Sequence, residues 1–212
     1  FLMNVAACGV NIIMNHQLVR QGGDLAIGAY GILNSYAILI VMSVMGLCQG
    51  MQPIVGYNYG ARQYSRVREA YRKAIVAASI ICCIAFVCFQ LFPRPIVALF
   101  DPSGSEEYFQ FAERYFRIYM FMTLANAFQP ITANFFTSIG KAKRGALIAL
   151  TRQVIFLIPL ILIFPLFLGI DGVMYAGPIA DSAAVVVALA LVTREMKRMP
   201  HVDEPVAADT LV

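Results

Sequence analysis

The stretch GLCQGMQPIVGYNYGARQYSRVREAYRK, residues 46–73, decides how this chain folds. An uncharged apolar run ends in Gly and Pro, passes through a Tyr-Asn-Tyr-Gly segment at Tyr57–Gly60, and enters a helix rich in Arg and Lys. Membrane proteins concentrate Lys and Arg in the short loops on the cytoplasmic side. The stretch therefore predicts a membrane helix that leaves the bilayer on that side, a turn, and a helix that re-enters.

The composition of all 212 residues agrees with a membrane environment. The chain is 60% hydrophobic and only 13% charged, whereas soluble domains are about a quarter charged. The net charge of +4 comes from basic residues gathered in loops between apolar runs, so it indicates membrane topology and not nucleic-acid binding. The predicted surroundings are the lipid bilayer.

Six apolar runs approach or exceed the roughly 20 residues that cross a bilayer, and their periodicity is helical. The predicted fold class is therefore an all-α membrane protein with a six-transmembrane-helix bundle in residues 1–199. The predicted helices are residues 2–20, 25–55, 74–92, 106–139, 146–168 and 173–197. Ser105 is predicted to cap the fourth helix, and residues 200–212 are predicted to form a polar, disordered cytoplasmic tail.

The distribution of charge predicts the orientation. Most of the 16 Lys and Arg residues lie in three segments that share one side of the membrane if the loop after the second helix is cytoplasmic. These residues are Arg62, Arg66, Arg68, Arg72 and Lys73, then Lys141, Lys143 and Arg144, then Arg194, Lys197 and Arg198. The C-terminus is therefore predicted to be cytoplasmic.

Five motifs that occur in order resemble the second half of a multidrug and toxic compound extrusion (MATE) transporter. The motifs are NHQLVRQGGDLAI (residues 15–27), QGMQPIVGYNYGA (49–61), SIGKA (138–142), RQVIFLIP (152–159) and GPIAD (177–181). The resemblance covers the chain from its first apolar run to about Arg198.

The resemblance implies one lobe of a twelve-helix, two-lobe transporter, namely helices seven to twelve. Such a protein is a secondary active multidrug and cation efflux antiporter, in which rocking of the two lobes gives alternating access. The implied partners are the missing N-terminal lobe or a second copy, and small organic substrates that are often cationic. The implied location is the bacterial inner membrane, and the implied coupling ion is H⁺ or Na⁺, with no other cofactor.

Two alternatives stay open at this point. One is a lipid-linked oligosaccharide flippase of the same superfamily, whose cavity is generally more basic; Arg152 is the only Lys or Arg well inside a late helix here. The other is a structural membrane bundle without transport. An enzyme is not predicted, because the sequence contains no nucleophile, metal or paired-acid motif.

Amide and hydroxyl side chains on the predicted helices are the candidate lining of a hydrated cavity, since such groups are costly in hydrocarbon unless they meet water or one another. Spacings of three and four place them on shared faces. The candidates are Asn11, Asn15, Asn34, Thr123, Asn126 and Gln129. The alternative interpretation is that they form hydrogen bonds between helices that stabilise the bundle.

Three further residues carry specific predictions. Asp181 lies ten residues past Asp171, about 15 Å along a helix, and is the candidate buried acid. Arg152 is interpreted as a structural residue that reaches toward the cytoplasm. Pro130 is the candidate hinge, with a static bend as the alternative. No metal site is predicted.

The sequence departs from the family pattern in one respect. Several Na⁺-coupled members use carboxylates in the first and fourth helices of this lobe. Here the first predicted helix has no acid and the fourth has none past Glu113. We therefore expect the coupling ion to bind mainly in the missing lobe.

Overall fold

The computed structural model describes residues 2–100, 105–121, 123, 125–200 and 203, and all of its regular elements are helices. The first four are α1 (Leu2–Gly60), α2 (Tyr64–Leu91), α3 (Pro93–Ala98) and α4 (Glu106–Met120). They are followed by α5 (Ala125–Ser138), α6 (Ala142–Leu150), the π-helix η1 (Thr151–Leu157), α7 (Ile158–Leu168) and α8 (Ile170–Arg198). The predicted all-α fold is confirmed.

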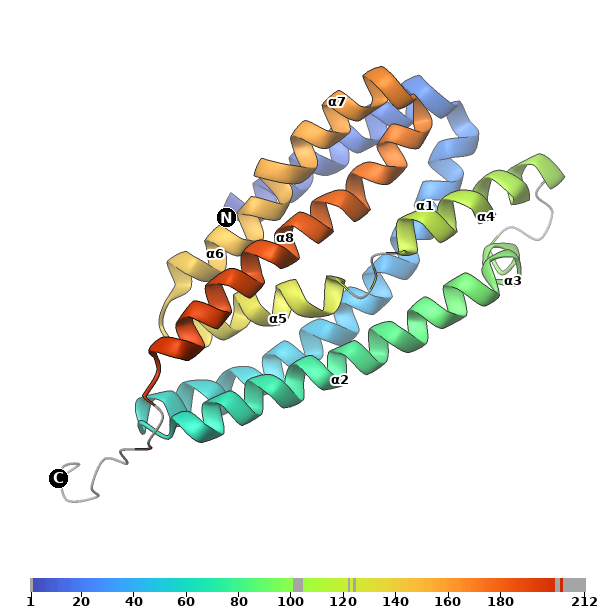
Figure 1. Cartoon of the computed structure of the whole chain (residues 1–212). Coiled ribbons are helices and arrows are strands. Elements are labelled where there is room, and N and C mark those ends of the chain that lie inside the picture. The colour runs from blue at the N-terminus through green and yellow to red at the C-terminus, as the bar shows by residue number, and fades with distance from the viewer. Residues whose placement is uncertain (1, 101–104, 122, 124, 201–202, 204–212) are drawn as a thin grey trace.

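The helices form an elongated bundle (Figure 1). The second half of α1 runs beside α2 along one edge. The first half of α1 lies with α7 and α8 along the opposite edge, and α4 and α5 lie between the two edges. One apolar core joins the second half of α1 to α2 and α5, and a smaller core joins its first half to α7 and α8.

A sharp bend at Gly23 divides α1 into the two predicted helices. Gly23 has φ 61° and ψ −154°, a backbone conformation that is open to glycine because it has no Cβ atom. The predicted turn at Tyr57–Gly60 is instead the last turn of α1, and the chain reverses over residues 61–63, where Arg62 has φ 56°. The predicted break and the observed one therefore differ by about one helical turn at this end.

The predicted helix 106–139 is interrupted between Met120 and Ala125, so that α4 and α5 are separate elements of 15 and 14 residues. Ser105 caps α4 as predicted, because its hydroxyl accepts a hydrogen bond from the Tyr108 N–H at 3.2 Å. Pro130 cannot donate to the carbonyl of residue 126 and crowds that carbonyl, which weakens the first turn of α5. The interruption falls just before this weakened turn.

Four described segments are long and apolar enough to cross a membrane: Ala26–Gly60, Tyr64–Leu91, Ala142–Leu168 and Ile170–Arg198. The other two predicted spans correspond to residues 2–22 of α1 and to the interrupted pair α4 and α5. Large apolar side chains cover much of the exterior; Phe167 is 81% exposed and Leu99 is 78% exposed. Such a surface needs hydrocarbon or another protein against it.

The C-terminal end of α8 lies beside the start of α2 (Figure 1). The Arg68 guanidinium donates hydrogen bonds to the carbonyls of Met199 at 3.0 Å and Pro200 at 2.7 Å. The Asp203 carboxylate accepts hydrogen bonds from the N–H of Ser65 at 2.8 Å and from its hydroxyl. The remainder of the predicted disordered tail lies outside the described residues.

Candidate functional site

A cavity of about 800 Å³ lies where both halves of α1 face α4, α5, η1 and α8. Its walls are mainly apolar, with Met14, Met42 and Met45 among the residues of α1. A smaller number of polar side chains converges on the same space from four elements. Ligand cavities in proteins have this character, an apolar wall with a few placed polar groups.

Two charged residues lie in the wall of this cavity, and they are paired. The Nε–H of Arg152 donates to Oδ1 of Asp181 at 2.5 Å, and the two side chains are 28% and 11% exposed. Arg152 lies on η1, and Asp181 lies on α8. Either charge alone would be costly at this depth, whereas the pair carries no net charge.

The π-helix places Arg152 in the wall. Pro159 follows η1 and has no N–H to donate to the carbonyl of residue 155, so the regular helical pattern fails there. The N–H of Ile158 instead bonds the carbonyl of Gln153, five residues earlier. Such widened turns are common at functional sites, and this one also brings Gln153 to the cavity.

An aromatic pair lies beside the ion pair. The rings of Tyr30 and Tyr119 meet edge to face, with centroids 6.0 Å apart and an interplanar angle of 87°. Gly177 on α8 allows this packing, because a Cβ atom at that position would lie 3.1 Å from Cε2 of Tyr119. The cavity wall therefore combines an aromatic pair with a charged pair.

The amide side chains of the cavity are only partly used within the lobe. Asn11 donates to the Ala7 carbonyl at 3.1 Å, and Gln129 donates to the Ile148 carbonyl at 3.3 Å. Oε1 of Gln153 is buried and accepts no hydrogen bond from the described part of the chain. A buried acceptor without a donor is costly, so a ligand or water that donates to Gln153 would be stabilised here.

The structure brings together Asn11, Asn34, Gln129, Pro130 and Asp181 from the predicted set, all in the cavity wall. Asn15 is exposed one turn from Asn11 and does not line this cavity. Thr123 is 1% exposed, outside the wall, because the interruption between α4 and α5 breaks its helical spacing to Gln129. The side chain of Asn126 lies outside the described part of the structure.

The sequence analysis did not place Arg152, Tyr30 or Gln153 in the site. Arg152 does not merely reach toward the cytoplasm, because its guanidinium binds Asp181 within the bundle. The sequence does contain a signal for this pair, because Arg152 and Asp181 are opposite charges at membrane depth and such charges usually pair. No sequence signal marked Tyr30 or Gln153. Among the described residues, no group of three or more His, Cys, Asp or Glu side chains could hold a metal ion.

Comparisons with known proteins agree with this architecture. The MatE family model matches residues 1–163. Multidrug export protein MepA from Staphylococcus aureus (strain bovine RF122 / ET3-1) is 24% identical over 192 residues, which cover 91% of this chain and 42% of that protein. The MepA protein of Staphylococcus haemolyticus (strain JCSC1435) is also 24% identical, over 91% of this chain and 41% of that protein.

Two solved structures share the fold. An outward-facing multidrug resistance MATE family transporter of the MOP superfamily superposes with a TM-score of 0.85 at 19% identity, over 93% of this chain and 44% of that chain. The MATE multidrug transporter DinF-BH, solved in complex with rhodamine 6G, superposes with a TM-score of 0.80 at 35% identity, over 92% and 43%.

The chain therefore spans less than half the length of the curated relatives it matches. This proportion agrees with the predicted single lobe of a two-lobe transporter. The family consists of membrane transporters and not of enzymes, in agreement with the sequence analysis. Because the family model covers more than half of its residues, this chain is an integral membrane protein that belongs to the MatE family.

Proposed function

We propose that this chain is one lobe of a multidrug efflux transporter and that its cavity forms part of the path taken by small organic, often cationic, substrates. The observation that carries the proposal is the cavity itself, which combines apolar walls, the Tyr30–Tyr119 pair and amide groups around Arg152 and Asp181. An amphipathic organic molecule can use each of these features.

The lobe needs a partner to move a substrate across the membrane. The partner is the other lobe or a second copy of this chain, and rocking of the two lobes exposes the cavity to each side in turn. In this proposal the C-terminus lies in the cytoplasm of a bacterial cell, at the inner membrane, which the clustering of Lys and Arg in the loops on that side supports. The similarity to multidrug export proteins supports the export function.

The coupling ion, H⁺ or Na⁺, binds mainly in the other lobe. Asp181 is the acid in the described wall of the cavity, and Arg152 already neutralises it. A cation that bound Asp181 would have to displace a guanidinium held beside it in a medium of low dielectric. Calorimetric titration of the purified chain with NaCl should therefore show no micromolar binding; such binding, abolished by Gln129→Leu, would contradict this assignment.

The balanced charge of the cavity wall also distinguishes drug export from lipid-linked oligosaccharide flipping. A flippase for an anionic lipid-linked sugar needs excess positive charge in its cavity, whereas Arg152 here is compensated by Asp181. The described wall therefore favours drug export over the flippase alternative.

The test is efflux by the lobe joined to the N-terminal half of a MATE transporter, in a bacterial strain that lacks its own drug pumps. Rhodamine 6G is a suitable probe, because it is bound in the DinF-BH structure. Gln129→Leu and Asn34→Leu alter the wall and should increase accumulation of the probe several-fold. Asn15→Leu, an exposed position outside the wall, is the matched control. Equal effects of the three substitutions on accumulation would show that the cavity is not part of the substrate path.

A further inference from the structure

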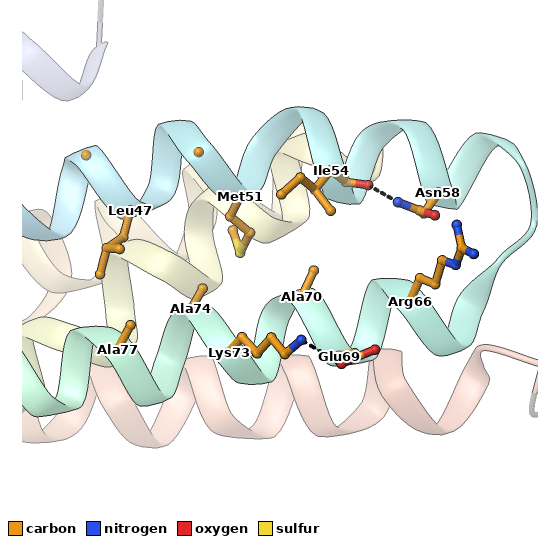
Figure 2. Close-up of a pocket in the computed structure, with 12 residues that line it drawn as sticks. Leu47, Met51, Ile54, Asn58, Arg66, Glu69, Ala70, Lys73, Ala74 and Ala77 are labelled. Carbon is orange, nitrogen blue, oxygen red and sulfur yellow. Dashed lines mark hydrogen bonds and ion pairs between the residues drawn. The ribbon is translucent and has the colours of Figure 1, made fainter.

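A second hollow of about 690 Å³ lies between α1 and α2 (Figure 2). We call it the α1–α2 groove. The two helices run antiparallel, so that Leu47 of α1 lies at the same end as Ala77 of α2, and Asn58 lies at the same end as Arg66. The groove adjoins the cavity described above at Gly46, which lines both.

The polarity of the groove changes along its length. One end is apolar and open, because a Cβ atom added to Gly46 or Gly50 would meet no atom within 4 Å. The other end carries Asn58 and Arg66, and the ion pair of Lys73 and Glu69 lies between the two ends (Figure 2). A ligand that fills the whole groove therefore has a long apolar part and a compact polar head.

The length of the groove matches one leaflet of a bilayer. The lining of α1 from Gly46 to Asn58 extends over about 18 Å of helix. Half of a hydrocarbon core of about 30 Å is about 15 Å. In the orientation given under the proposed function, the apolar end would lie near the middle of the membrane and the polar end at the interface, where a lipid headgroup resides.

The polar end presents unused groups for an anion and for a hydrogen-bond donor. Arg66 forms no ion pair with any described residue, although the Glu69 carboxylate also lines the groove, interacts electrostatically with Arg66 and pairs with Lys73 at 2.7 Å. Asn58 is only 8% exposed; its Nδ2 donates to the Ile54 carbonyl at 2.7 Å, while its Oδ1 is buried without a partner among the described residues.

The adjoining face of α2 is suited to contact with lipid tails. Starting one turn after Lys73, exposed apolar side chains follow one another at spacings of three or four residues. They are Val76 at 52%, Ile80 at 55%, Ile84 at 61%, Val87 at 49% and Leu91 at 65% exposed. The groove is therefore continuous with a stripe that hydrocarbon would cover.

We propose that the α1–α2 groove binds an anionic glycerophospholipid of the cytoplasmic leaflet. One acyl chain lies along the apolar end, and the phosphate binds Arg66. A hydroxyl or ammonium donor of the headgroup bonds Oδ1 of Asn58. The proposal rests on the membrane orientation given under the proposed function, and it does not depend on transport.

The first experiment measures retained lipid by native mass spectrometry of the purified full chain in detergent, after addition of one lipid at a time. Phosphatidylglycerol has a net negative charge and hydroxyl donors, phosphatidylethanolamine has an ammonium donor but no net charge, and phosphatidylcholine has neither a net charge nor a hydrogen-bond donor. Retention should fall in that order, with at least a fivefold difference between the first and the last. Equal retention of all three would overturn the proposal.

Matched variants locate the bound lipid. Arg66→Gln should reduce phosphatidylglycerol retention several-fold, whereas Arg72→Gln, which removes an exposed charge of α2 outside the groove, should not. Gly50→Leu fills the open end and should abolish retention, whereas Gly31→Leu, at an equally open position of α1 outside the groove, should not. Circular dichroism of each variant checks that the helices are intact.

Three outcomes would assign the groove differently and overturn the proposal. Displacement of the lipid by millimolar inorganic phosphate alone would indicate a free-anion site. Equal losses in Arg66→Gln and Arg72→Gln would indicate general attraction to a basic surface. Dimers that contain no lipid and that Gly50→Leu dissociates would assign the groove to a second copy of the chain. Efflux of rhodamine 6G, measured separately, decides the transport function in every case.

Discussion

Arg152 on the π-helix and Asp181 on α8 form an ion pair, with Nε and Oδ1 2.5 Å apart, in the wall of the large cavity. The pair joins two helices that also share an apolar cluster, and it lets both charges lie at membrane depth. Arg152 and Asp181 can therefore each be buried only because the other neutralises its charge.

Replacing one residue of this pair should reduce the stability of the protein more, per residue replaced, than replacing both. Arg152→Gln or Asp181→Asn leaves an uncompensated charge and should lower the free energy of unfolding by about 3–5 kcal/mol, whereas the double variant should lose clearly less than the sum. Urea or thermal unfolding of the purified chain in detergent measures the three values. Additive losses would show that the two side chains are not coupled.

Glu195 should be the most sensitive acid at the basic end of the lobe. Its side chain is 2% exposed and bonds both Lys141 and Arg144. Glu195→Gln leaves these two cations without their acid and should reduce stability on the order of 3 kcal/mol. The control is Glu69→Gln, which breaks an exposed pair with Lys73 and should cost far less stability. Similar melting temperatures for the two variants would contradict the buried role of Glu195.

Gly145 should tolerate no side chain. A Cβ atom there would lie 2.5 Å from the Ala133 carbonyl oxygen and 2.9 Å from Oγ1 of Thr137, so Gly145→Ala forces α6 away from α5. We expect a loss of about 1–3 kcal/mol. Gly31→Ala meets no atom within 4 Å and should be neutral or stabilising, since alanine favours helix. Thermal melts compare the two, and a neutral Gly145→Ala would show that the helices are not in this close contact.

Pro130 tests the hinge prediction in the joined transporter. If α5 bends at this residue during transport, Pro130→Ala should slow rhodamine 6G efflux several-fold while binding of the dye stays the same. Pro165→Ala, in α7 and outside the cavity wall, is the control. Unchanged efflux in Pro130→Ala would identify a static bend.

Asp203 should titrate below an ordinary aspartate. Hydrogen bonds from the Ser65 hydroxyl and N–H stabilise the carboxylate and lower the pKa of Asp203. Because the pKa is lower in the folded protein, the contact is complete above about pH 4 and is lost as the pH falls through the lowered pKa. A ¹³C NMR titration measures this pKa, which Ser65→Ala should raise toward the usual value. An unshifted pKa in the unaltered chain would show that the tail is not held at Ser65.

Local sequence signals located most of the helix ends. Ser105, followed by two acids, began α4 where predicted, because capping depends on the neighbouring backbone alone. The glycine pair at residues 22–23 marked the bend in α1 for the same reason. The interruption before α5 was missed, because Pro130 weakens a turn several residues upstream of itself. The widened turn at η1 likewise depends on Pro159, which follows it.

The candidate site was predicted in composition and not in arrangement. Polar residues in apolar runs pointed to Asn11, Asn34, Gln129 and Asp181, because the cost of burying a polar group is visible in the sequence. The sequence did not predict that Arg152 and Asp181 form a pair, because no local pattern shows which helices lie next to each other.

By itself the sequence determined the solvent of this protein, its helical class and its family, because burial of polar groups in lipid constrains every span independently of its neighbours. Only the tertiary structure decided which side chains meet. The bend at Gly23, the interruption before Ala125 and the π-helix rotate the helix faces relative to one another. These irregularities place Arg152 against Asp181 and exclude Thr123 from the cavity.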